Sequence, residues 1–524
     1  MSKKTFKHIC LAAFLIMSCH KGATNNQLKP NVVLIYADDL GRGMLSYYGQ
    51  KIVKTPNIDR LAYQGLVFEN ARGCMLCAPA RASMLTGYHD CHPDKWKITK
   101  GGAYYAVSDS ISDDLISNTI EKLVPEHKNI HHMAQVFKDV GYTTAQFGKL
   151  EWGFSVSKKQ MDAHGWDHYC GYLDHMRAHG FYPPFLFEDG DIMPMSGNTR
   201  KDCGKTIEPE TPESYKDRWD MTGKKLYSPN IILTKLLVFI QQNKNKPFFI
   251  YHPTTLPHGP VAVPEVHQDF IENDTLTEVE KEYASMVKML DQHVGRILDE
   301  LKQHRLLDNT LFIFTSDNGH ELYYTMKGRC TKKGKNILTG VNYNNINTKY
   351  YSECGGDIFD GNDGMAGRKR DNWEGGSRVP LIMSWPAEIK GHREVSNLVA
   401  NFDLITTFAD MLHIQLQDPK DGISLWPVMN GTGPDTEHTY VVNASFQGAS
   451  IVTNEGWKLR HYAPKNTFQL FYLPDDYREK HDLSHQHPER VILLKKQLLK
   501  ECSGDYNNGL FSAKSNIIPV VVNP

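Results

Sequence analysis

The hydrophobic pattern of the chain alternates between short apolar runs and longer amphipathic segments. Asn31–Ala37 is a near-continuous apolar, β-branched run, as expected for a strand buried on both faces in a parallel sheet. Residues 247–251, 310–315 and 379–384 have the same character. Residues 277–301 show apolar positions at the three-four spacing of a helix. Strands that alternate with helices predict an α/β core whose sheet is mostly parallel.

The pattern changes after about residue 429. Short strand-like pieces follow at residues 439–442, 450–453, 457–462 and 468–473, and a helix is predicted at 489–499. This change predicts a main domain over residues 28–429 and a smaller α+β C-terminal subdomain over residues 430–524. Residues 328–365 show little periodicity and are interpreted as a long insertion.

The first residues resemble an export signal. Lys3, Lys4 and Lys7 precede an apolar run over residues 9–17 that is too short to span a bilayer. The sequence IMSC at residues 16–19 resembles a bacterial lipobox, in which Cys19 would be lipidated, and plain secretory cleavage is the alternative. Residues 1–19 therefore predict a signal peptide and an exported bacterial protein. It would be periplasmic or a lipoprotein of the outer membrane or cell surface, held to the membrane by its lipid anchor alone.

Composition and charge exclude other classes of protein. The 524 residues are 40% hydrophobic and 23% charged, with a formal net charge of −1 and no long basic run, so we expect no nucleic-acid partner. The ten cysteines are scattered, and their spacing determines no disulfide connectivity.

Polar side chains follow three of the predicted strands. In order along the chain these are Asp38 and Asp39, His252 and His258, and Asp317 and Asn318. Ligands of open α/β sheets bind at the carboxyl ends of the strands, so these segments are expected to converge on one site. The aspartate and asparagine oxygens suit Ca²⁺ or Mg²⁺ better than zinc. Ordinary turn chemistry is the alternative interpretation.

The segment CAPAR at residues 77–81, followed by SMLTG at 83–87, carries the strongest signal. A Cys74–Cys77 redox pair, a zinc half-site and an inert buried cysteine are the alternatives. A redox pair should lie beside a thioredoxin-like pattern, and a zinc site needs a second ligand pair; neither is evident. The segment resembles the C-x-P-x-R signature of the type I sulfatases. In that family a maturation enzyme oxidises the cysteine to formylglycine.

The resemblance extends from about residue 30 to 495. The matching segments are residues 31–49, 55–62, 148–149 (GK), 257–260 (PHGP), 316–319 (SDNG), 374–380 (EGGSRVP) and 468–489. It implies an alkaline-phosphatase-like α/β sandwich in which residues 28–429 form the catalytic domain. It also implies the hydrolysis of sulfate monoesters, helped by a formylglycine-generating maturation enzyme as a partner.

Formylglycine explains why a cysteine is needed at position 77. Its hydrated aldehyde is a geminal diol, of which one hydroxyl attacks sulfur while the other lets the aldehyde reform and expel sulfate. A serine lacks the second hydroxyl and would remain esterified.

The resemblance also assigns roles to the site residues. The divalent ion, Ca²⁺ with Mg²⁺ as the alternative, would be held by Asp38, Asp39, Cys77, Asp317 and Asn318. Arg81 would stabilise the modified side chain. Lys149 and Lys369 would bind sulfate oxygens. His258 would bind sulfate and protonate the departing oxygen, and His89 would assist from nearby.

One position departs from the family pattern. Glu151 stands two residues after Lys149, where the family usually has a histidine that relays a proton. Either Glu151 takes over as base or hydrogen-bond partner, or another histidine does. A carboxylate beside an anionic sulfate is unfavourable unless it is paired or protonated.

The substrate is expected to be a sulfated saccharide. Residues 172–190 combine His175, Arg177 and His179 with aromatic side chains and prolines in a predicted loop, and such donors suit a sugar. A packed aromatic loop is the alternative. We expect an exo-acting carbohydrate sulfatase, with galactose or N-acetylgalactosamine sulfates as candidates. The rival functions are a phosphatase or phosphodiesterase of the same superfamily, and an inactive glycan-binding lipoprotein.

Overall fold

The structure is a computed structural model. It describes residues 29–92, 95, 98–108, 110–124, 130–206, 218–324, 342, 349–432, 436–512 and 517–522. The predicted signal peptide with Cys19 and most of the predicted insertion at 328–365 lie outside these residues. Within the described part of the chain, no helix combines the length and the apolar character needed to cross a membrane.

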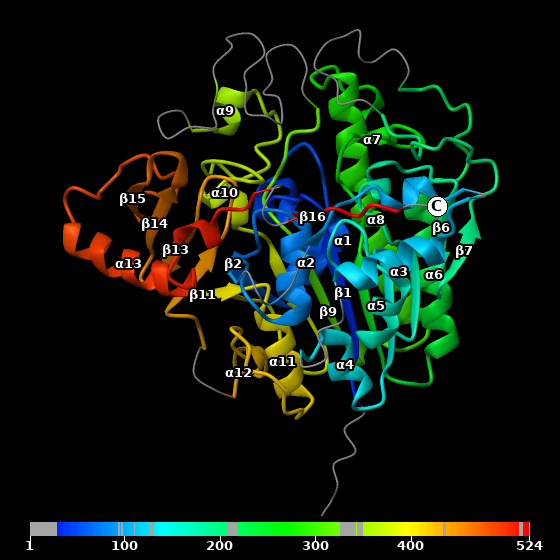
Figure 1. The fold of residues 1–524 in the computed structure, drawn as a ribbon, viewed down its shortest axis with the longest axis horizontal. Coiled ribbons are helices and arrows are strands. Elements are labelled where there is room, and N and C mark those ends of the chain that lie inside the picture. The colour runs from blue at the N-terminus through cyan, green and yellow to red at the C-terminus, as the bar shows by residue number, and fades with distance from the viewer. Residues whose placement is uncertain are drawn as a thin grey trace, which may run out of the picture.

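A ten-stranded sheet forms the centre of the molecule (Figure 1). In spatial order its strands are β11 (Arg393–Ala400), β2 (Leu66–Arg72), β10 (Leu381–Ser384), β9 (Thr310–Ser316), β1 (Asn31–Ala37), β8 (Phe248–Pro253), β4 (Thr143–Lys149), β5 (His168–Tyr172), β6 (Phe185–Glu188) and β7 (Asp191–Pro194). The run from β9 to β5 is parallel throughout. The predicted strand at 379–384 is present as β10, but it pairs antiparallel with both neighbours.

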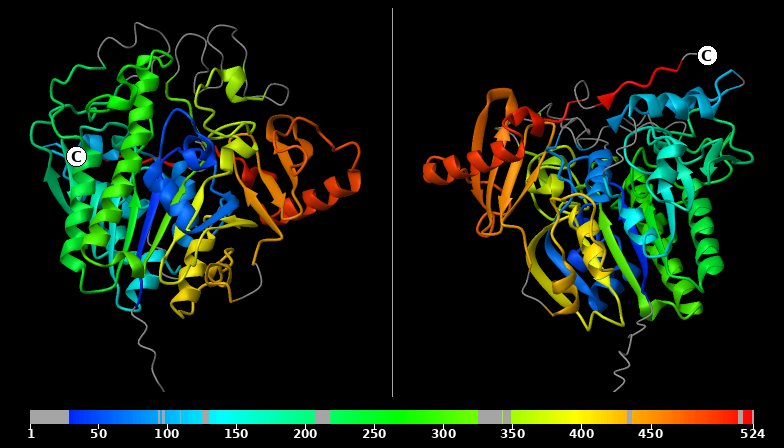
Figure 2. Two further views of the ribbon diagram at one scale, coloured as in Figure 1. Left: turned by 180° about the vertical axis from the view of Figure 1, so that it is seen from behind. Right: turned by 60° about the horizontal axis from the view of Figure 1, so that its bottom comes forward.

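Helices cover both faces of this sheet, which explains why β1 is apolar along its whole length. Val33 and Ile35 share one cluster with residues of α1 (Pro56–Gln64), α6 (Ser228–Asn243) and α8 (Glu278–Gln303). Val32 and Leu34 share the other with residues of α2 (Cys77–Thr86), α4 (Met133–Lys138) and α11 (Asp403–Met411). Figures 1 and 2 show the two helical layers from opposite sides. The α/β sandwich predicted from the sequence is confirmed.

The smaller α+β unit lies beside β11, at the left of Figure 1. Its antiparallel sheet consists of β12 (Tyr440–Asn443), β13 (Ser450–Thr453), β14 (Trp457–Tyr462) and β15 (Thr467–Tyr472), covered by α13 (Pro488–Glu501). The end of the chain returns to the main domain, because β16 (Ile517–Ile518) pairs with β3 (Ile98–Thr99).

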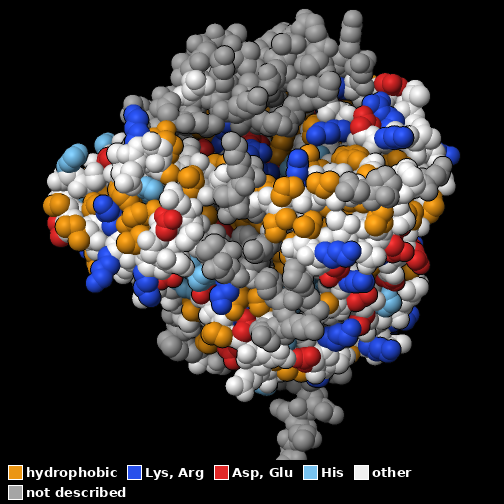
Figure 3. Space-filling view, in the orientation of Figure 1, with side chains coloured by type: hydrophobic (Ala, Val, Ile, Leu, Met, Phe, Trp, Pro, Cys, Tyr) orange, Lys and Arg blue, Asp and Glu red, His pale blue; other side chains and the backbone are white. Residues whose placement is uncertain are grey.

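The other α-helices of the described residues lie in the connections. They are α3 (Asp113–Leu123), α5 (Lys158–Ala163), α7 (Gln268–Ile271), α9 (Ser352–Gly355), α10 (Glu374–Ser377) and α12 (Trp426–Asn430). The segment 172–190, expected as a loop, contains the 3₁₀ turn η4 (Arg177–His179) and the strand β6. The face seen in Figure 3 is hollowed in its upper middle, with Lys and Arg side chains at the edge of the hollow.

Candidate active site

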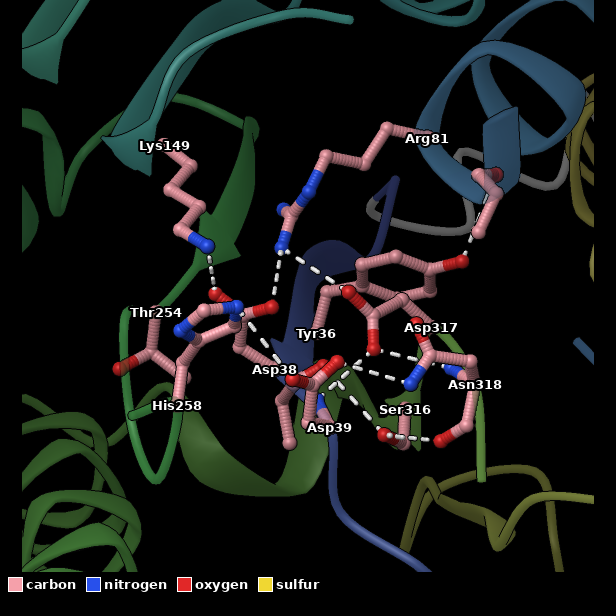
Figure 4. Close-up of polar contacts among 12 residues, drawn as sticks. Tyr36, Asp38, Asp39, Arg81, Lys149, Thr254, His258, Ser316, Asp317 and Asn318 are labelled. Carbon is pink, nitrogen blue, oxygen red and sulfur yellow. Dashed lines mark hydrogen bonds and ion pairs between the residues drawn. The ribbon is translucent and has the colours of Figure 1, made fainter. Parts of the chain in front are cut away.

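The carboxyl ends of β1 and β9 bring the predicted metal ligands together (Figure 4). Ala37 pairs with Ser316 in the parallel register, so the residues that follow each strand are neighbours. The Asp39 backbone N–H donates to Asp317 Oδ1 at 2.9 Å, and Asn318 Nδ2 donates to Asp39 Oδ1 at 2.8 Å. Asp39 is held in the left-handed region at φ 64°, a strained backbone for a non-glycine residue.

Cys77 and Arg81 reach this cluster from the first two turns of α2. The Cys77 sulfur and carboxylate oxygens of Asp38 and Asp317 all lie within 4.8 Å of one another. Arg81 Nη2 lies 3.7 Å from Asp38 Oδ1 and 3.4 Å from Asp317 Oδ2 (Figure 4). Burial raises the pKa of the Cys77 thiol and outweighs the two nearby lysines, which lower it. The thiol is therefore neutral at neutral pH and is a poor nucleophile as it stands.

Two buried lysines contact the carboxylates. Lys149, at the end of β4, pairs with Asp38, and Lys369 Nζ lies 2.6 Å from Asp39 Oδ2. His258 Nε2 lies 3.3 Å from the same Asp39 oxygen and 3.4 Å from Lys369 Nζ. Burial and the two lysine charges hold the pKa of His258 well below its ordinary value. The cluster thus combines buried carboxylates, buried cations and a neutral imidazole.

The donors of this cluster fit a hard divalent cation. Asn318 Oδ1 is buried and has no hydrogen-bond partner among the described residues. Burial and the negative charges of Asp38 and Asp39 raise the pKa of Asp317 well above its ordinary value. A divalent cation would relieve this repulsion and give the free amide oxygen a partner, and carboxylate and amide oxygens are the ligands that Ca²⁺ prefers.

Glu151 is buried close to the cluster but faces other partners. Its Oε2 lies 2.9 Å from His164 Nδ1, and its Oε1 accepts a hydrogen bond from Trp166 Nε1. Trp166 in turn stacks on Tyr251, whose hydroxyl contacts Arg81 Nη1 at 3.4 Å. This geometry is that of a hydrogen-bond partner, and the role of Glu151 as base stays a prediction.

Of the predicted sugar-binding residues, His175 and His179 lie near the cluster, whereas Arg177 packs elsewhere. The His179 ring stacks on His258 at 4.3 Å, and His179 Nε2 is buried without a hydrogen-bond partner among the described residues. His175 Nε2 contacts the Leu150 carbonyl at 3.1 Å, and the charge of Arg81 adds to burial in lowering the His175 pKa. Arg177 instead donates from Nη2 to the Phe185 carbonyl, and its guanidinium group lies over the Phe185 ring. The Arg177 contacts with Phe185 are those of a packing residue.

His89 lies at the junction with the C-terminal subdomain instead of in the cluster around Asp39. Its Nε2 is 3.3 Å from Glu501 Oε2 and 3.7 Å from Asp421 Oδ2, and its ring stacks on His92. The proximity of His89 to Cys77 in sequence does not carry over into space, because α2 separates them by its full length.

Two tyrosines of the cluster were missed by the sequence analysis. The Tyr323 hydroxyl donates to Asp39 Oδ2 and lies 3.2 Å from His258 Nε2. Nothing in the local pattern around Tyr323 indicates this contact. Tyr251 carries a detectable signal, because it places a hydroxyl inside the apolar run of β8.

Comparisons with known proteins agree with this geometry. The family model described as Sulfatase matches residues 30–414, and a model described as N-sulphoglucosamine sulphohydrolase, C-terminal, matches residues 366–503. The first match covers well over half of the chain. The protein therefore belongs to the sulfatase family and is a sulfuric ester hydrolase, as the resemblance predicted.

Individual relatives are more distant. The chain is 27% identical to an N-acetylgalactosamine-6-O-sulfatase of Bacteroides thetaiotaomicron, over 90% of this chain and 93% of that protein. It is 25% identical to the human steryl-sulfatase, over 79% and 72% of the two chains. The crystal structure of Ps i-CgsB in complex with k-i-k-neocarrahexaose superposes with a TM-score of 0.66 at 22% identity, covering 92% of this chain and 95% of that one. This likeness shows the fold alone.

Proposed function

We propose that the protein removes sulfate from carbohydrates as an exo-acting sulfatase, through a formylglycine derived from Cys77 and a bound divalent cation. The observation that carries the proposal is the position of Cys77. It stands within 4.8 Å of two carboxylates and beside three buried cations, Arg81, Lys149 and Lys369. A sulfate monoester is anionic, and a site that hydrolyses it must neutralise its oxygens while presenting a nucleophile.

The cation would be held by Asp38, Asp39, Asp317 and Asn318, with Ca²⁺ favoured by the all-oxygen donor set. When bound, it neutralises sulfate oxygens and acidifies the attacking hydroxyl. When residue 77 is the hydrated aldehyde, it supplies both the attacking hydroxyl and the second hydroxyl that allows sulfate to leave.

The two lysines are proposed to bind sulfate oxygens. In the structure each rests on a carboxylate, Lys149 on Asp38 and Lys369 on Asp39. An entering sulfate would compete for the ammonium groups, and the released carboxylate oxygens would face the cation. The binding of substrate and that of the cation would therefore favour each other. Sulfate would take the ammonium groups away from the carboxylates, and the cation would pair with the carboxylates that are left.

His258 is proposed to protonate the departing sugar oxygen. Its low pKa in the structure reflects burial beside Lys149 and Lys369. A bound sulfate would place negative charge next to the imidazole and would raise its pKa, so that it can carry the proton it donates. Tyr323, in contact with both Asp39 and His258, would hold the imidazole in position.

A carbohydrate substrate is supported by the site and by one relative. His179 presents beside His258 a buried Nε2 with no hydrogen-bond partner in the described part of the chain, and such a donor or acceptor suits a sugar hydroxyl. The relative from Bacteroides thetaiotaomicron is named for N-acetylgalactosamine 6-O-sulfate. We therefore take N-acetylgalactosamine and galactose sulfates as the first substrates to test.

Maturation and export complete the proposal. Cys77 is only 2% exposed in the folded protein, so a formylglycine-generating enzyme would have to act before the chain folds. The lipobox-like leader, with its Cys19, supports an exported lipoprotein anchored through its N-terminus.

The decisive experiment is peptide mass spectrometry across residue 77 after co-expression with a formylglycine-generating enzyme. Conversion of the thiol to the aldehyde lowers the mass by roughly 18 Da, and a hydrazine traps the product. The matured protein should then release sulfate from N-acetylgalactosamine or galactose sulfates. Cys77→Ser is the matched control and should fold but not turn over.

The outcomes separate the rival functions. A thiol that persists at residue 77 beside a competent maturation enzyme would contradict formylglycine catalysis and favour a glycan-binding lipoprotein. Hydrolysis of phosphate esters in preference to sulfate esters would favour the phosphatase or phosphodiesterase function.

A further inference from the structure

A second group of metal-ligating side chains lies at the junction of the two domains. His89 and His92 belong to the loop that follows α2, and Asp421 lies in the connection between α11 and α12. Glu501 is the last residue of α13 in the C-terminal subdomain. Three parts of the chain that are far apart in sequence therefore present two imidazoles and two carboxylates to one another.

Three of the separations between their ligand atoms are close to those of a tetrahedral zinc site. With metal–ligand bonds of about 2.0–2.1 Å, ligand atoms at the corners of a tetrahedron lie about 3.4 Å apart. His92 Nε2 is 2.9 Å from Asp421 Oδ2. His89 Nε2 is 3.7 Å from the same oxygen and 3.3 Å from Glu501 Oε2. These separations lie on either side of the ideal edge, and His89, His92 and Asp421 offer ligand atoms that all lie within 4.8 Å of one another. Glu501 would complete the set through the Oε2 atom that faces His89.

The charges of the group also favour an ion. The rings of His89 and His92 stack at 4.0 Å with an interplanar angle of 16°, so one ring would have to turn before both Nε2 lone pairs point at one ion. Two imidazolium cations at this distance would repel each other, whereas two neutral imidazoles can share one metal ion. Asp421 and Glu501 bring two carboxylates to these imidazoles, which would balance the charge of a divalent ion.

An ion can reach the group from solvent. A cavity of about 220 Å³ is lined by His89, Asp421 and Glu501 together with His438. One contact would have to change, because the Cys91 backbone N–H approaches His89 Nδ1 at 3.3 Å. Metal binding through Nε2 places the ring proton on Nδ1, and this long hydrogen bond would be lost.

We propose that His89, His92, Asp421 and Glu501 bind one zinc ion, which joins the C-terminal subdomain to the loop behind the active-site helix α2. Two imidazoles and two carboxylates form a set that zinc accepts, in contrast to the all-oxygen group around Asp317. The site is structural, since all four positions are taken by protein ligands. It is independent of the chemistry at Cys77.

The test is zinc stoichiometry on the full chain, measured by mass spectrometry of the metal after chelation, reloading with zinc in excess Ca²⁺ and gel filtration. The wild type should retain one zinc ion per chain. His92→Ala and the milder Asp421→Asn should weaken zinc binding by about tenfold or more. His485→Ala, which removes an exposed histidine, is the matched control and should bind like the wild type.

Thermal unfolding gives a second readout that does not depend on activity. Zinc should raise the Tm of the wild type and of His485→Ala by roughly 2 °C or more, and should leave that of His92→Ala unchanged. Two alternative sites are controlled directly. Cys502→Ser tests the buried thiols Cys91 and Cys502, which hydrogen bond to each other, and Asp317→Ala tests the catalytic cluster.

Three results would overturn the proposal. In the first, the wild type retains no zinc. In the second, His92→Ala retains as much zinc as the wild type. In the third, zinc is lost in Cys502→Ser or Asp317→Ala while His92→Ala keeps it. Loss confined to His92→Ala and Asp421→Asn would establish the site.

Discussion

The catalytic cluster and the ion-pair network around Glu374, at the junction between the domains, both bury several charges. They differ in how closely each charge is paired. At the junction, Glu374 accepts from Arg72 Nη1 at 2.6 and 2.7 Å and pairs with Lys458 at 3.0 Å. Glu479 in turn pairs with Lys458 at 2.9 Å and accepts a hydrogen bond from the Glu374 backbone N–H at 2.7 Å. Each carboxylate oxygen of this pair therefore lies within 3.0 Å of a cation or an N–H group. In the catalytic cluster, Asp38 Oδ1 and Asp317 Oδ2 reach Arg81 Nη2 only at 3.7 and 3.4 Å.

The catalytic cluster leaves part of its polar surface without a partner. Asn318 Oδ1 has none among the described residues, and burial together with the charges of Asp38 and Asp39 raises the pKa of Asp317. Buried polar groups are normally satisfied, and exceptions call for a reason. The difference teaches that the junction network holds the domains together, whereas the catalytic cluster is arranged for a ligand that completes it.

The largest expected effect comes from removing a cation ligand. Asp317→Ala should lower kcat/KM by about 10³-fold or more, because the cation that neutralises the sulfate oxygens would no longer be held. Metal analysis should show the loss of bound Ca²⁺. Asp317→Asn should lose activity as well, but should make the metal-free protein more stable, since it removes one of three crowded negative charges. Unchanged metal content in Asp317→Ala would contradict the ligand assignment.

Lys369→Ala should have the next largest effect. Loss of one cation that binds the sulfate oxygens should lower kcat/KM by about 10²-fold. Lys369 pairs with a buried carboxylate, as Lys458 does, so Lys458→Ala is the matched control. That variant should unfold more easily and keep its activity per folded molecule. If Lys369→Ala, like Lys458→Ala, lost stability but kept its activity per folded molecule, the role of Lys369 in binding sulfate would be contradicted.

Glu374→Gln tests the junction through pH. Although burial raises the pKa of Glu374, the charges of Arg72 and Lys458 outweigh it and hold the pKa below its ordinary 4.5. The stabilisation is therefore present above pH 4.5 and is lost as the pH falls below it. Urea unfolding should show a cost of about 3 kcal/mol for Glu374→Gln at pH 7. The cost should shrink below pH 4.5, and a constant cost would contradict the ionic interpretation.

Glu151→Gln is expected to have the smallest effect. Both Glu151 oxygens are engaged by His164 and Trp166, and glutamine can still accept one of these hydrogen bonds. If Glu151 only positions its neighbours, kcat should fall by less than about tenfold and the pH profile of kcat should keep its shape. A general base contributes about 10²-fold or more, so a larger fall with a lost acidic limb would assign the base to Glu151.

The sequence by itself determined the features that depend on local pattern. The apolar runs predicted the central strands, and the aspartates that follow β1 and β9 were predicted to converge because the carboxyl ends of parallel strands meet at one edge. Thr277 and Glu280 form the capping box of α8 as their spacing indicates. The signature at Cys77 placed the chain in its family, because a dense set of short motifs survives where overall identity is low.

Only the tertiary structure decided which partner each polar side chain takes. His89 lies two residues beyond the C-cap of α2, yet it contacts Glu501, which is 412 positions away. Arg177 covers Phe185 while His179, on the same turn, stacks on His258. The antiparallel pairing of β10 and the contact of Tyr323 with Asp39 are further examples. Such contacts join segments that the chain brings together only on folding, and no local spacing records them.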